Sequence, residues 1–193
     1  MKYAICTFFL ILSLTNFGCK SNIQSSTKAK SIALFSEISE EWSTSGNADW
    51  KIANGILTGN GAEGYVTTTT EFDNFTLTAE FFPDKVVNSG IFIRCPKDEV
   101  SATGCYEINI WDNHINQDFR TGAIVTHGKP LAHLETIGKW NNYKIRAENN
   151  HMQVWLNGVK TADLVSEITS NGFITLQVKG GVIKFRNVRI ERL

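Results

Sequence analysis

The chain has 193 residues, 42% of them hydrophobic, so it is long enough to bury one good core and fits one domain better than two. Its 19 basic and 19 acidic residues cancel, and they are dispersed along the chain without a basic stripe. Nucleic acid is therefore excluded as an expected partner.

The first residues have the pattern of an export signal. Lys2 supplies a positive charge, and the apolar run AICTFFLILSL over 4–14 is long enough for a signal-peptide core but too short to span a bilayer. Gly18 and Cys19 follow, and this order indicates a lipoprotein signal over 1–18 with lipid attached to Cys19. The alternative is an ordinary cleaved secretory signal in which Cys19 has no role. We expect an exported protein, lipid-anchored in the bacterial cell envelope, whose membrane contact is this anchor alone.

A polar segment, 19–31, separates the signal from the domain. It is rich in Ser and Lys and has no hydrophobic period, so it is predicted to be a flexible tether. The folded domain is expected over 32–193.

The domain has the sequence pattern of β-structure throughout. Short runs rich in Val, Ile, Phe, Thr and Tyr alternate with clusters of Asn, Asp, Gly and Ser, and Asn54-Gly55 and Asn157-Gly158 are typical of tight hairpin turns. The fold class is therefore all-β, a sandwich of two antiparallel sheets or a jelly roll. The expected strands lie near 50–58, 64–70, 75–82, 89–95, 105–111, 121–126, 142–148, 151–157, 172–179 and 182–192.

Four of these strands, in 75–82, 88–94, 105–111 and 172–179, share an unusual outward face. Since neighbouring side chains on a strand point to opposite sides, the residues opposite the apolar ones combine carboxylates, cations, amides and aromatic rings. Sugars are bound by such a mixture, because rings pack on C–H patches and polar groups bind hydroxyls. The alternative is a solvated sheet face of mixed composition. The outward set includes Glu80, Asn88, Arg94, Glu107, Asn109, Trp111, Gln177 and Lys179.

The sequence resembles the 3-keto-disaccharide hydrolase domain family, which has a concanavalin A-like lectin/glucanase jelly roll. The resemblance covers about 32–193, and the ordered set of stretches carries it. That set includes DWKIANGILTG, TEFDNFTLTAEF, NSGIFIR, GCYEINIWDN, GKWNNYKI, VWLNGV, GFITLQVKG and IKFRNVRI.

The resemblance implies cleavage of glycosides oxidised at sugar C3, by hydrolysis or by elimination followed by hydration. The positions that match the family's site are Asn88, Arg94, Glu107, Asn109, Asp112 and Gln177. The chain departs from the family pattern at Asn109, where Gln is usual, and at Lys179, where His is usual.

This chemistry assigns expected roles. A ketone at C3 acidifies the C2 proton, so the site needs a base, an acid and groups that stabilise the enolate. Glu107 is the expected base, Arg94 and Lys179 the oxyanion partners, and His114 the imidazole candidate for the acid. The alternative for Glu107 is a salt bridge to Arg94.

The remaining site residues are expected to bind substrate. The amides of Asn88, Asn109 and Gln177 would orient hydroxyls, and Trp111 would stack on a sugar. A conventional glycosidase would instead need a second carboxylate near Glu107, which Glu80 or Asp112 would supply.

Neither a metal nor a cofactor is expected. The segment WDNHINQDF alternates acidic and polar side chains, but Gln117 occupies the place of the calcium-loop glycine, and no distal Glu follows at the required spacing. A polar loop at the groove rim is the favoured interpretation.

Two cysteines remain in the exported domain, Cys95 and Cys105, and a disulfide between them is the favoured expectation. Strict alternation opposes a simple cross-strand pair, because Cys95 follows the core parity of its strand and Cys105 the groove parity of Glu107. A bulge or turn near Pro96 or Gly104 would reset the parity. The alternative is two separate thiols.

Two functions are therefore expected, an enzyme that cleaves keto-glycosides and, alternatively, a non-catalytic carbohydrate-binding lipoprotein that uses the same groove.

Overall fold

The computed structural model describes Met1, residues 32–34, 42–97 and 99–193. The expected signal peptide beyond Met1, Cys19 and the tether lie outside the described residues. No helix in the described part of the chain is long and apolar enough to cross a membrane.

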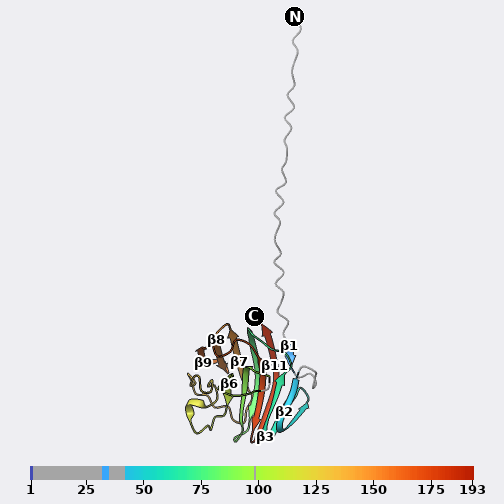
Figure 1. The fold of residues 1–193 in the computed structure, drawn as a ribbon, viewed down its shortest axis with the longest axis vertical. Helices are drawn as coiled ribbons and strands as arrows, with labels where there is room; N and C mark the ends of the chain where they lie inside the picture. Colours follow the sequence, from blue (N-terminus) through green and yellow to red (C-terminus); the bar gives the residue numbers. More distant parts are fainter. Residues whose placement is uncertain (2–31, 35–41, 98) are drawn as a thin grey trace.

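The described residues form eleven strands and one short 3-10 turn, η1 (Gln117–Phe119) (Figure 1). The strands are β1 (Ile32–Leu34), β2 (Trp42–Ala53), β3 (Ile56–Thr68), β4 (Phe75–Pro83), β5 (Asn88–Cys95), β6 (Tyr106–Ile110), β7 (Asn141–Glu148), β8 (His151–Leu156), β9 (Val159–Val165), β10 (Phe173–Lys179) and β11 (Val182–Arg192).

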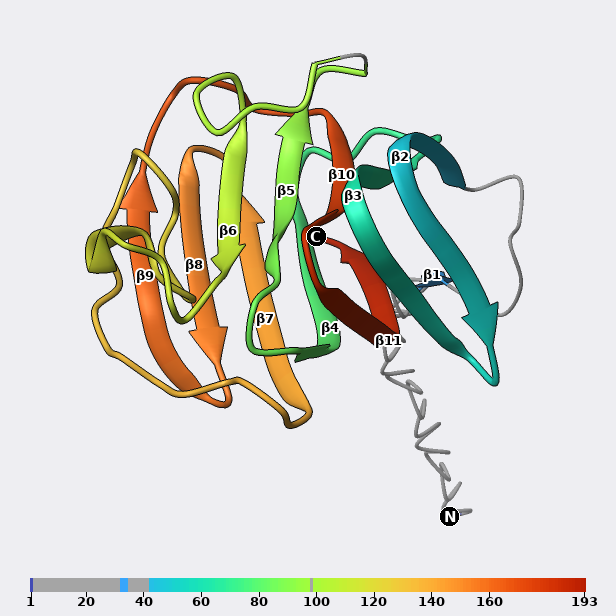
Figure 2. The ribbon, with the colours of Figure 1, turned by 90° about the horizontal axis from the view of Figure 1, so that it is seen from below.

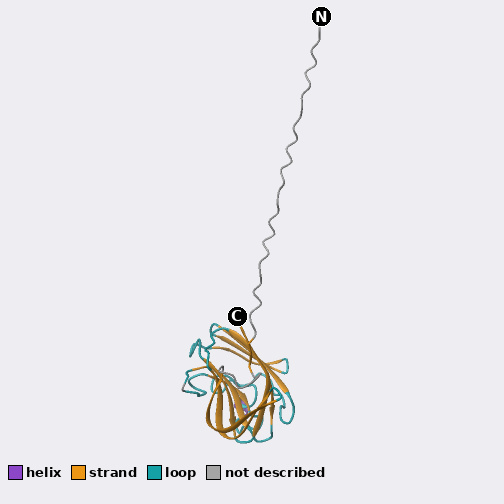
Figure 3. Ribbon diagram, turned by 90° about the vertical axis from the view of Figure 1, so that its right-hand side faces the viewer, coloured by secondary structure: helices purple, strands orange, loops and turns teal. Residues whose placement is uncertain are grey.

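The strands form two antiparallel layers around one core, as Figures 2 and 3 show. The front layer contains β6, β5, β10 and the second half of β3, with β2 beside it. The back layer contains β11, β4, β7, β8 and β9, with β1 on β11. The predicted jelly-roll sandwich is confirmed.

A bend in β3 joins the two layers. Residues 57–60 of β3 pair with β11 in the back layer, whereas residues 64–67 pair with β10 in the front layer. Gly61 lies between these two parts with a φ of 90°, a conformation that glycine adopts without a steric penalty. The predicted strand over 50–58 instead contains the end of β2, the Asn54-Gly55 turn and the start of β3, and the strand predicted over 64–70 is the second half of β3.

The turns follow the sequence prediction. Asn54 and Gly55 have φ values of 52° and 72°, and Asn157 and Gly158 have 50° and 82°, as a two-residue hairpin turn with positive φ requires. The predicted strand over 121–126 forms only isolated bridges, at Ile124. β9, which follows the second of these turns, is absent from the predicted set.

The core between the layers is apolar and continuous. Alternate residues of β4 are fully buried, Phe75, Leu77, Ala79 and Phe81 among them, and they meet the inward residues of the front layer. Burial of the apolar surface of these side chains drives folding. The outer face of the front layer is thereby left to carry the polar side chains.

Candidate active site

A carboxylate lies almost buried on the outer face of the front layer. Glu107 of β6 is 9% exposed, and its register neighbours are Phe92 on β5 and then Thr175 on β10. No hydrogen bond to its side chain forms within the described part of the chain. Burial, and secondly the charge of Glu63, raises the pKa of Glu107 to about 7, while Lys179 opposes the shift.

A glycine makes room for this carboxylate. Gly90 of β5 lies between Asn109 of β6 and Gln177 of β10 in the register. A Cβ atom at this position would lie 3.1 Å from Oε1 of Glu107, closer than ordinary contact. The missing side chain therefore leaves a notch in which Glu107 sits beside Gln177.

Gln177 carries a second polar group without a partner. Its side chain is 6% exposed, and its Oε1 is buried with no hydrogen-bond donor in the described structure. Its Nε2 lies 3.4 Å from Glu63 Oε1 and 3.5 Å from the Tyr65 hydroxyl. A buried acceptor without a donor is costly, so this pair of unsatisfied groups indicates a place where a polar ligand would bind.

Two residues outside the predicted set, Glu63 and Tyr65, complete the cluster. The Tyr65 hydroxyl donates to Glu63 Oε1 at 2.5 Å, and Lys179 Nζ lies 3.0 Å from Glu63 Oε2. The hydrogen bond from Tyr65 is the largest cause that lowers the pKa of Glu63, and burial is the largest cause that raises the pKa of Tyr65 to about 12. The alternation of Tyr65 with Val66 along β3 is the sequence signal that could have identified Tyr65.

Two further predicted residues lie on the same face. Asn88 of β5 is half-buried and pairs in register with Lys179 of β10. Trp111 follows β6 in the parity of Glu107, and its ring lies 4.4 Å from that of His114. The structure thus brings Glu107, Gln177, Lys179 and Asn88 to one face, with Trp111 at its end.

Arg94 is a correction to the predicted site. Its side chain is fully buried and donates to the backbone carbonyl oxygens of Asp73, Asn149 and Thr169, at 2.6–3.4 Å. The reason is an extra residue in β5 between its Phe92 and Cys95 pairs with β10, where Arg94 adopts a φ of 57°. Arg94 therefore fixes three loops and faces neither Glu107 nor solvent.

Glu80 is a second correction. It lies on the outer face of β4 in the back layer, where Arg186 Nε and Asn187 Nδ2 donate to its carboxylate at 2.7 Å each. The strand order places β5, β10, β3 and β11 between β6 and β4. Glu80 and Glu107 consequently cannot form a carboxylate pair across one groove.

Asp112 and Asn109 organise the loop that follows β6. The carboxylate of Asp112 accepts hydrogen bonds from Thr136 N at 2.6 Å, from Thr136 Oγ1 at 2.8 Å and from Ile137 N at 3.3 Å. The amide of Asn109 donates to the Phe119 carbonyl and accepts from Ile110 N. The side chains of Asp112 and Asn109 were expected to bind substrate, but their polar atoms form hydrogen bonds within the protein.

His114 belongs to this loop as well. Its Nδ1 lies 2.8 Å from the Asn116 carbonyl and 3.0 Å from the Asn116 N–H, and its ring meets those of Trp111 and Phe119 edge to face. The structure shows no contact between His114 and Glu107. Among the described residues, no group of three or more His, Cys, Asp or Glu is placed to hold a metal ion.

Cys95 and Cys105 are joined by a disulfide. The extra residue at Arg94 resets the parity of β5 and brings Cys95 to the outer face, where it packs with Phe92 and Cys105. Alternation alone places Cys95 in the core. The reset occurs at Arg94, upstream of the predicted positions Pro96 and Gly104.

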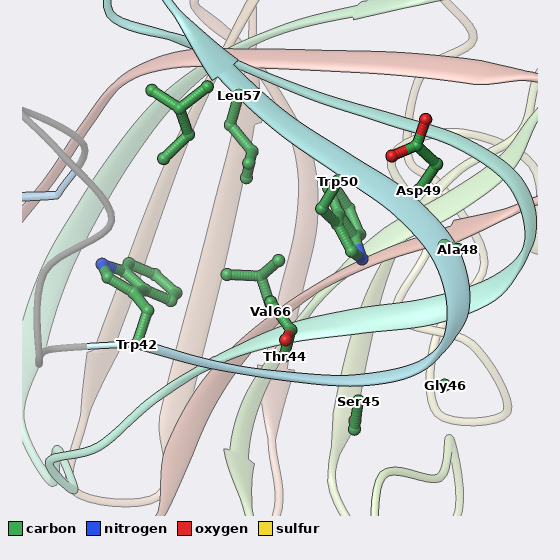
Figure 4. Close-up of a pocket in the computed structure, with 10 residues that line it drawn as sticks. Trp42, Thr44, Ser45, Gly46, Ala48, Asp49, Trp50, Leu57 and Val66 are labelled. Atoms are coloured by element: carbon green, nitrogen blue, oxygen red, sulfur yellow. The ribbon is translucent and has the colours of Figure 1, made fainter.

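An apolar cavity of about 390 Å³ lies at the corner between β2 and β3 (Figure 4). Trp42, Trp50, Leu57 and Val66 line it, and Asp49 is the one acidic residue among the lining residues. It contains none of the predicted site residues. Apart from Asp49, its lining residues carry no acid–base group, whereas Glu63, Glu107 and Lys179 lie together on the outer face of the front layer.

The fold and this polar face define a jelly-roll domain of the concanavalin A-like lectin and glucanase type. Residues 30–191 match the family described as 3-keto-alpha-glucoside-1,2-lyase-like domain, and the chain belongs to this family.

Solved structures show the same fold. A candidate glycosyl hydrolase from Parabacteroides distasonis is 27% identical, with a TM-score of 0.73 over 85% of this chain and 100% of that one. The carbohydrate binding module CBM66 of Bacillus subtilis is 18% identical, with a TM-score of 0.61 over 78% of this chain and 95% of the module. The Bacillus licheniformis beta-glucanase is 12% identical, with a TM-score of 0.62 over 87% and 99%. A search of curated proteins found no match to this chain.

Proposed function

We propose that this protein cleaves glycosides oxidised at sugar C3, with Glu107 as the base. The observation that carries the proposal is the almost buried carboxylate of Glu107, without a hydrogen-bond partner among the described residues, next to the unsatisfied amide oxygen of Gln177. Membership of the 3-keto-alpha-glucoside-1,2-lyase-like family supports the substrate class.

The chemistry begins with the proton at C2, which the neighbouring ketone acidifies. Glu107 takes this proton, and the C–H electrons form the enolate with its charge on the C3 oxygen. The enolate then reforms the ketone, a C1–C2 double bond forms as the C1–O bond breaks, and the leaving oxygen takes up the proton that Glu107 removed. Addition of water across the resulting C1–C2 double bond completes a net hydrolysis.

The neighbours of Glu107 have matching roles in this proposal. A base works best when its pKa lies near the working pH, and burial moves the pKa of Glu107 to about 7. Of the two predicted oxyanion partners, Arg94 is buried elsewhere, so Lys179 alone would stabilise the charge of the enolate. Gln177 would bind a hydroxyl of the sugar.

Turnover of a 3-keto-glucoside by the purified protein tests the proposal. Glu107→Gln keeps the shape of the side chain and removes the base, so turnover should fall by about a hundredfold or more. Glu167→Gln is the matched control, because Glu167 is exposed and the change removes the same charge elsewhere. Equal loss in both variants, or full activity in Glu107→Gln, would contradict the role of Glu107.

The second candidate is a non-catalytic carbohydrate-binding protein that uses the same face. The observation in its favour is that Lys179, at the position where the family pattern has His, is already paired with Glu63. In that case the wild-type protein binds the glycoside without turnover, and Gln177→Ala weakens binding while Glu107→Gln leaves it in place.

A further inference from the structure

A row of basic side chains crosses the outer face of the back layer, on the side of the molecule opposite the candidate active site. In register, Arg189 of β11 pairs with Thr78 of β4, which pairs with Lys144 of β7. Lys144 in turn pairs with Trp155 of β8, and Trp155 pairs with Lys160 of β9. These five strands lie side by side in Figure 2. Because residues that pair in register point to the same side of a sheet, the five side chains form one line, here called the basic row.

The side chains of the basic row are accessible to solvent. Lys144 and Arg189 are exposed, whereas Thr78, Trp155 and Lys160 are half-buried. The amino groups of Lys144 and Lys160 lie 5.3 Å and 5.4 Å from the centre of the Trp155 ring. Cation–π contacts extend to about 6 Å, so both cations flank the ring loosely and are free to bind an anion beside it. The row thus presents an aromatic ring between two cations.

Two of the three cations in the basic row have no acidic partner. Neither Lys144 nor Arg189 forms an ion pair with a described residue, whereas Lys160 Nζ lies 2.7 Å from Asp163 Oδ2. The other carboxylates beside the row are two that have arginine partners and one, on β11, that has none: Glu80, Glu148 and Glu191. The row and its surroundings therefore keep a net positive charge, although the chain as a whole is neutral.

The three cations are regularly spaced. Arg189, Lys144 and Lys160 lie on alternate strands, so successive cations are about 10 Å apart at a strand spacing of about 4.8 Å. A sugar ring in an extended chain takes up about the length of one strand spacing. A polysaccharide with an acid group on every second sugar would therefore bring one acid group to each cation. The sugars in between would meet Thr78 and Trp155, a hydroxyl and an aromatic ring that suit a neutral sugar.

We propose that the basic row binds an extended acidic polysaccharide that carries its carboxylates on alternate sugars. Charge complementarity, and the alternation of cations with Thr78 and Trp155 across five strands, carry this inference. It does not depend on the proposed function, because the row and Glu107 lie on the outer faces of different layers. Such a site would hold the protein on a polymer and leave the front layer free.

Calorimetric titration of the purified protein with a hyaluronan hexasaccharide tests this site, because hyaluronan carries a carboxylate on every second sugar. An N-acetylglucosamine hexamer is the neutral comparison, and an oligothymidylate of the same net charge is a polyanion of a different class. We expect hyaluronan to bind more tightly than either comparison ligand, and its binding to weaken as salt screens the charges. No binding of hyaluronan, or equal binding of either comparison ligand, would overturn the proposal.

Removal of the two unpaired cations tests the charge of the basic row. Lys144→Gln with Arg189→Gln should weaken hyaluronan binding by about fivefold or more, because two ion pairs with the polymer are lost. Lys85→Gln with Lys97→Gln is the matched control, since both lysines are exposed outside the back layer and the change removes the same charge. Equal weakening in the control would show that only total charge matters and would overturn the site.

Removal of the ring tests the contact with the intervening sugar. Trp155→Ala should weaken hyaluronan binding by about threefold or more. Trp140→Ala is the matched control, because the guanidinium of Arg186 already covers the Trp140 ring at 3.9 Å from its centre, and its binding should equal that of the wild type. Thermal unfolding checks that each variant is folded. Unchanged binding in Trp155→Ala, or an equal loss in Trp140→Ala, would overturn the proposed alternation of cation and ring.

Discussion

At the scale of single residues, Glu107 combines two properties that oppose each other in a folded protein. A carboxylate that is 9% exposed and without a hydrogen-bond partner among the described residues is destabilised in its charged form. Proteins keep such groups where they serve a purpose, because a buried amide of the same shape would be less costly. The cost of keeping Glu107 should therefore be measurable without any substrate.

The pH dependence of stability measures this cost. The pKa of Glu107 is raised from 4.5 to about 7, so between these values the folded state holds a proton that the unfolded state has lost. The stability contributed by this proton is complete below pH 4.5, falls through the window and is gone above about pH 7. Glu107→Gln should accordingly be more stable than the wild type at pH 8, by on the order of 3 kcal/mol, and nearly equal to it at pH 4.

Urea unfolding with the disulfide intact, at pH 4, 6 and 8, checks this expectation. Glu167→Gln should track the wild type at all three values. A difference between wild type and Glu107→Gln that stays constant with pH would show that Glu107 titrates normally in the folded protein.

Arg94 has a side chain that is common in binding sites, but its buried position gives it a structural role. Arg94→Ala would leave the carbonyl oxygens of Asp73, Asn149 and Thr169 without their shared donor, and should destabilise the domain by about 3 kcal/mol or more. Lys179→Ala, at an exposed position, should cost less than about 1 kcal/mol. Urea midpoints compare the two, and an unchanged midpoint for Arg94→Ala would restore its assignment to the groove.

At the scale of elements, the irregular end of β5 decides what the front layer can carry. One extra residue between Phe92 and Cys95 moves a cation inward and a cysteine outward. The same bulge therefore removes a predicted oxyanion partner and makes the disulfide geometrically possible. The disulfide in turn holds the loop between the two cysteines against the outer face of the front layer.

Removing the disulfide tests the contribution of this loop. The two cysteines are 10 residues apart, so Cys95→Ser with Cys105→Ser should lower the free energy of unfolding by roughly 2–3 kcal/mol at best. Thiol titration of the unreduced, denatured domain should find no free thiol from either position. Two free thiols there would show that the bridge does not form in the protein.

At the scale of the whole molecule, the N-terminal segment is expected to set where the domain works. With its native leader, the protein should partition into detergent, because a lipid on Cys19 would anchor it. Cys19→Ser should release it or block processing. Detergent partitioning that is unchanged in Cys19→Ser would rule out the anchor and favour an ordinary cleaved signal.

The sequence by itself determined the fold class, most strands and the hairpin turns, because alternation and turn chemistry are local properties. It also identified Glu107, Gln177 and Lys179 as sharing a face, since each lies in a regular stretch where parity holds. Beyond such stretches parity failed, as Arg94 shows.

Only the tertiary structure decided which strands share a layer. Glu80 follows the same alternation as Glu107, yet the pairing of β4 with β7 and β11 places it on the back layer. Glu63 and Tyr65 join the site because β10 pairs with β3 across a separation in sequence that no local pattern encodes. The charge environment of Glu107, and with it the proposed chemistry, is therefore a product of long-range strand pairing.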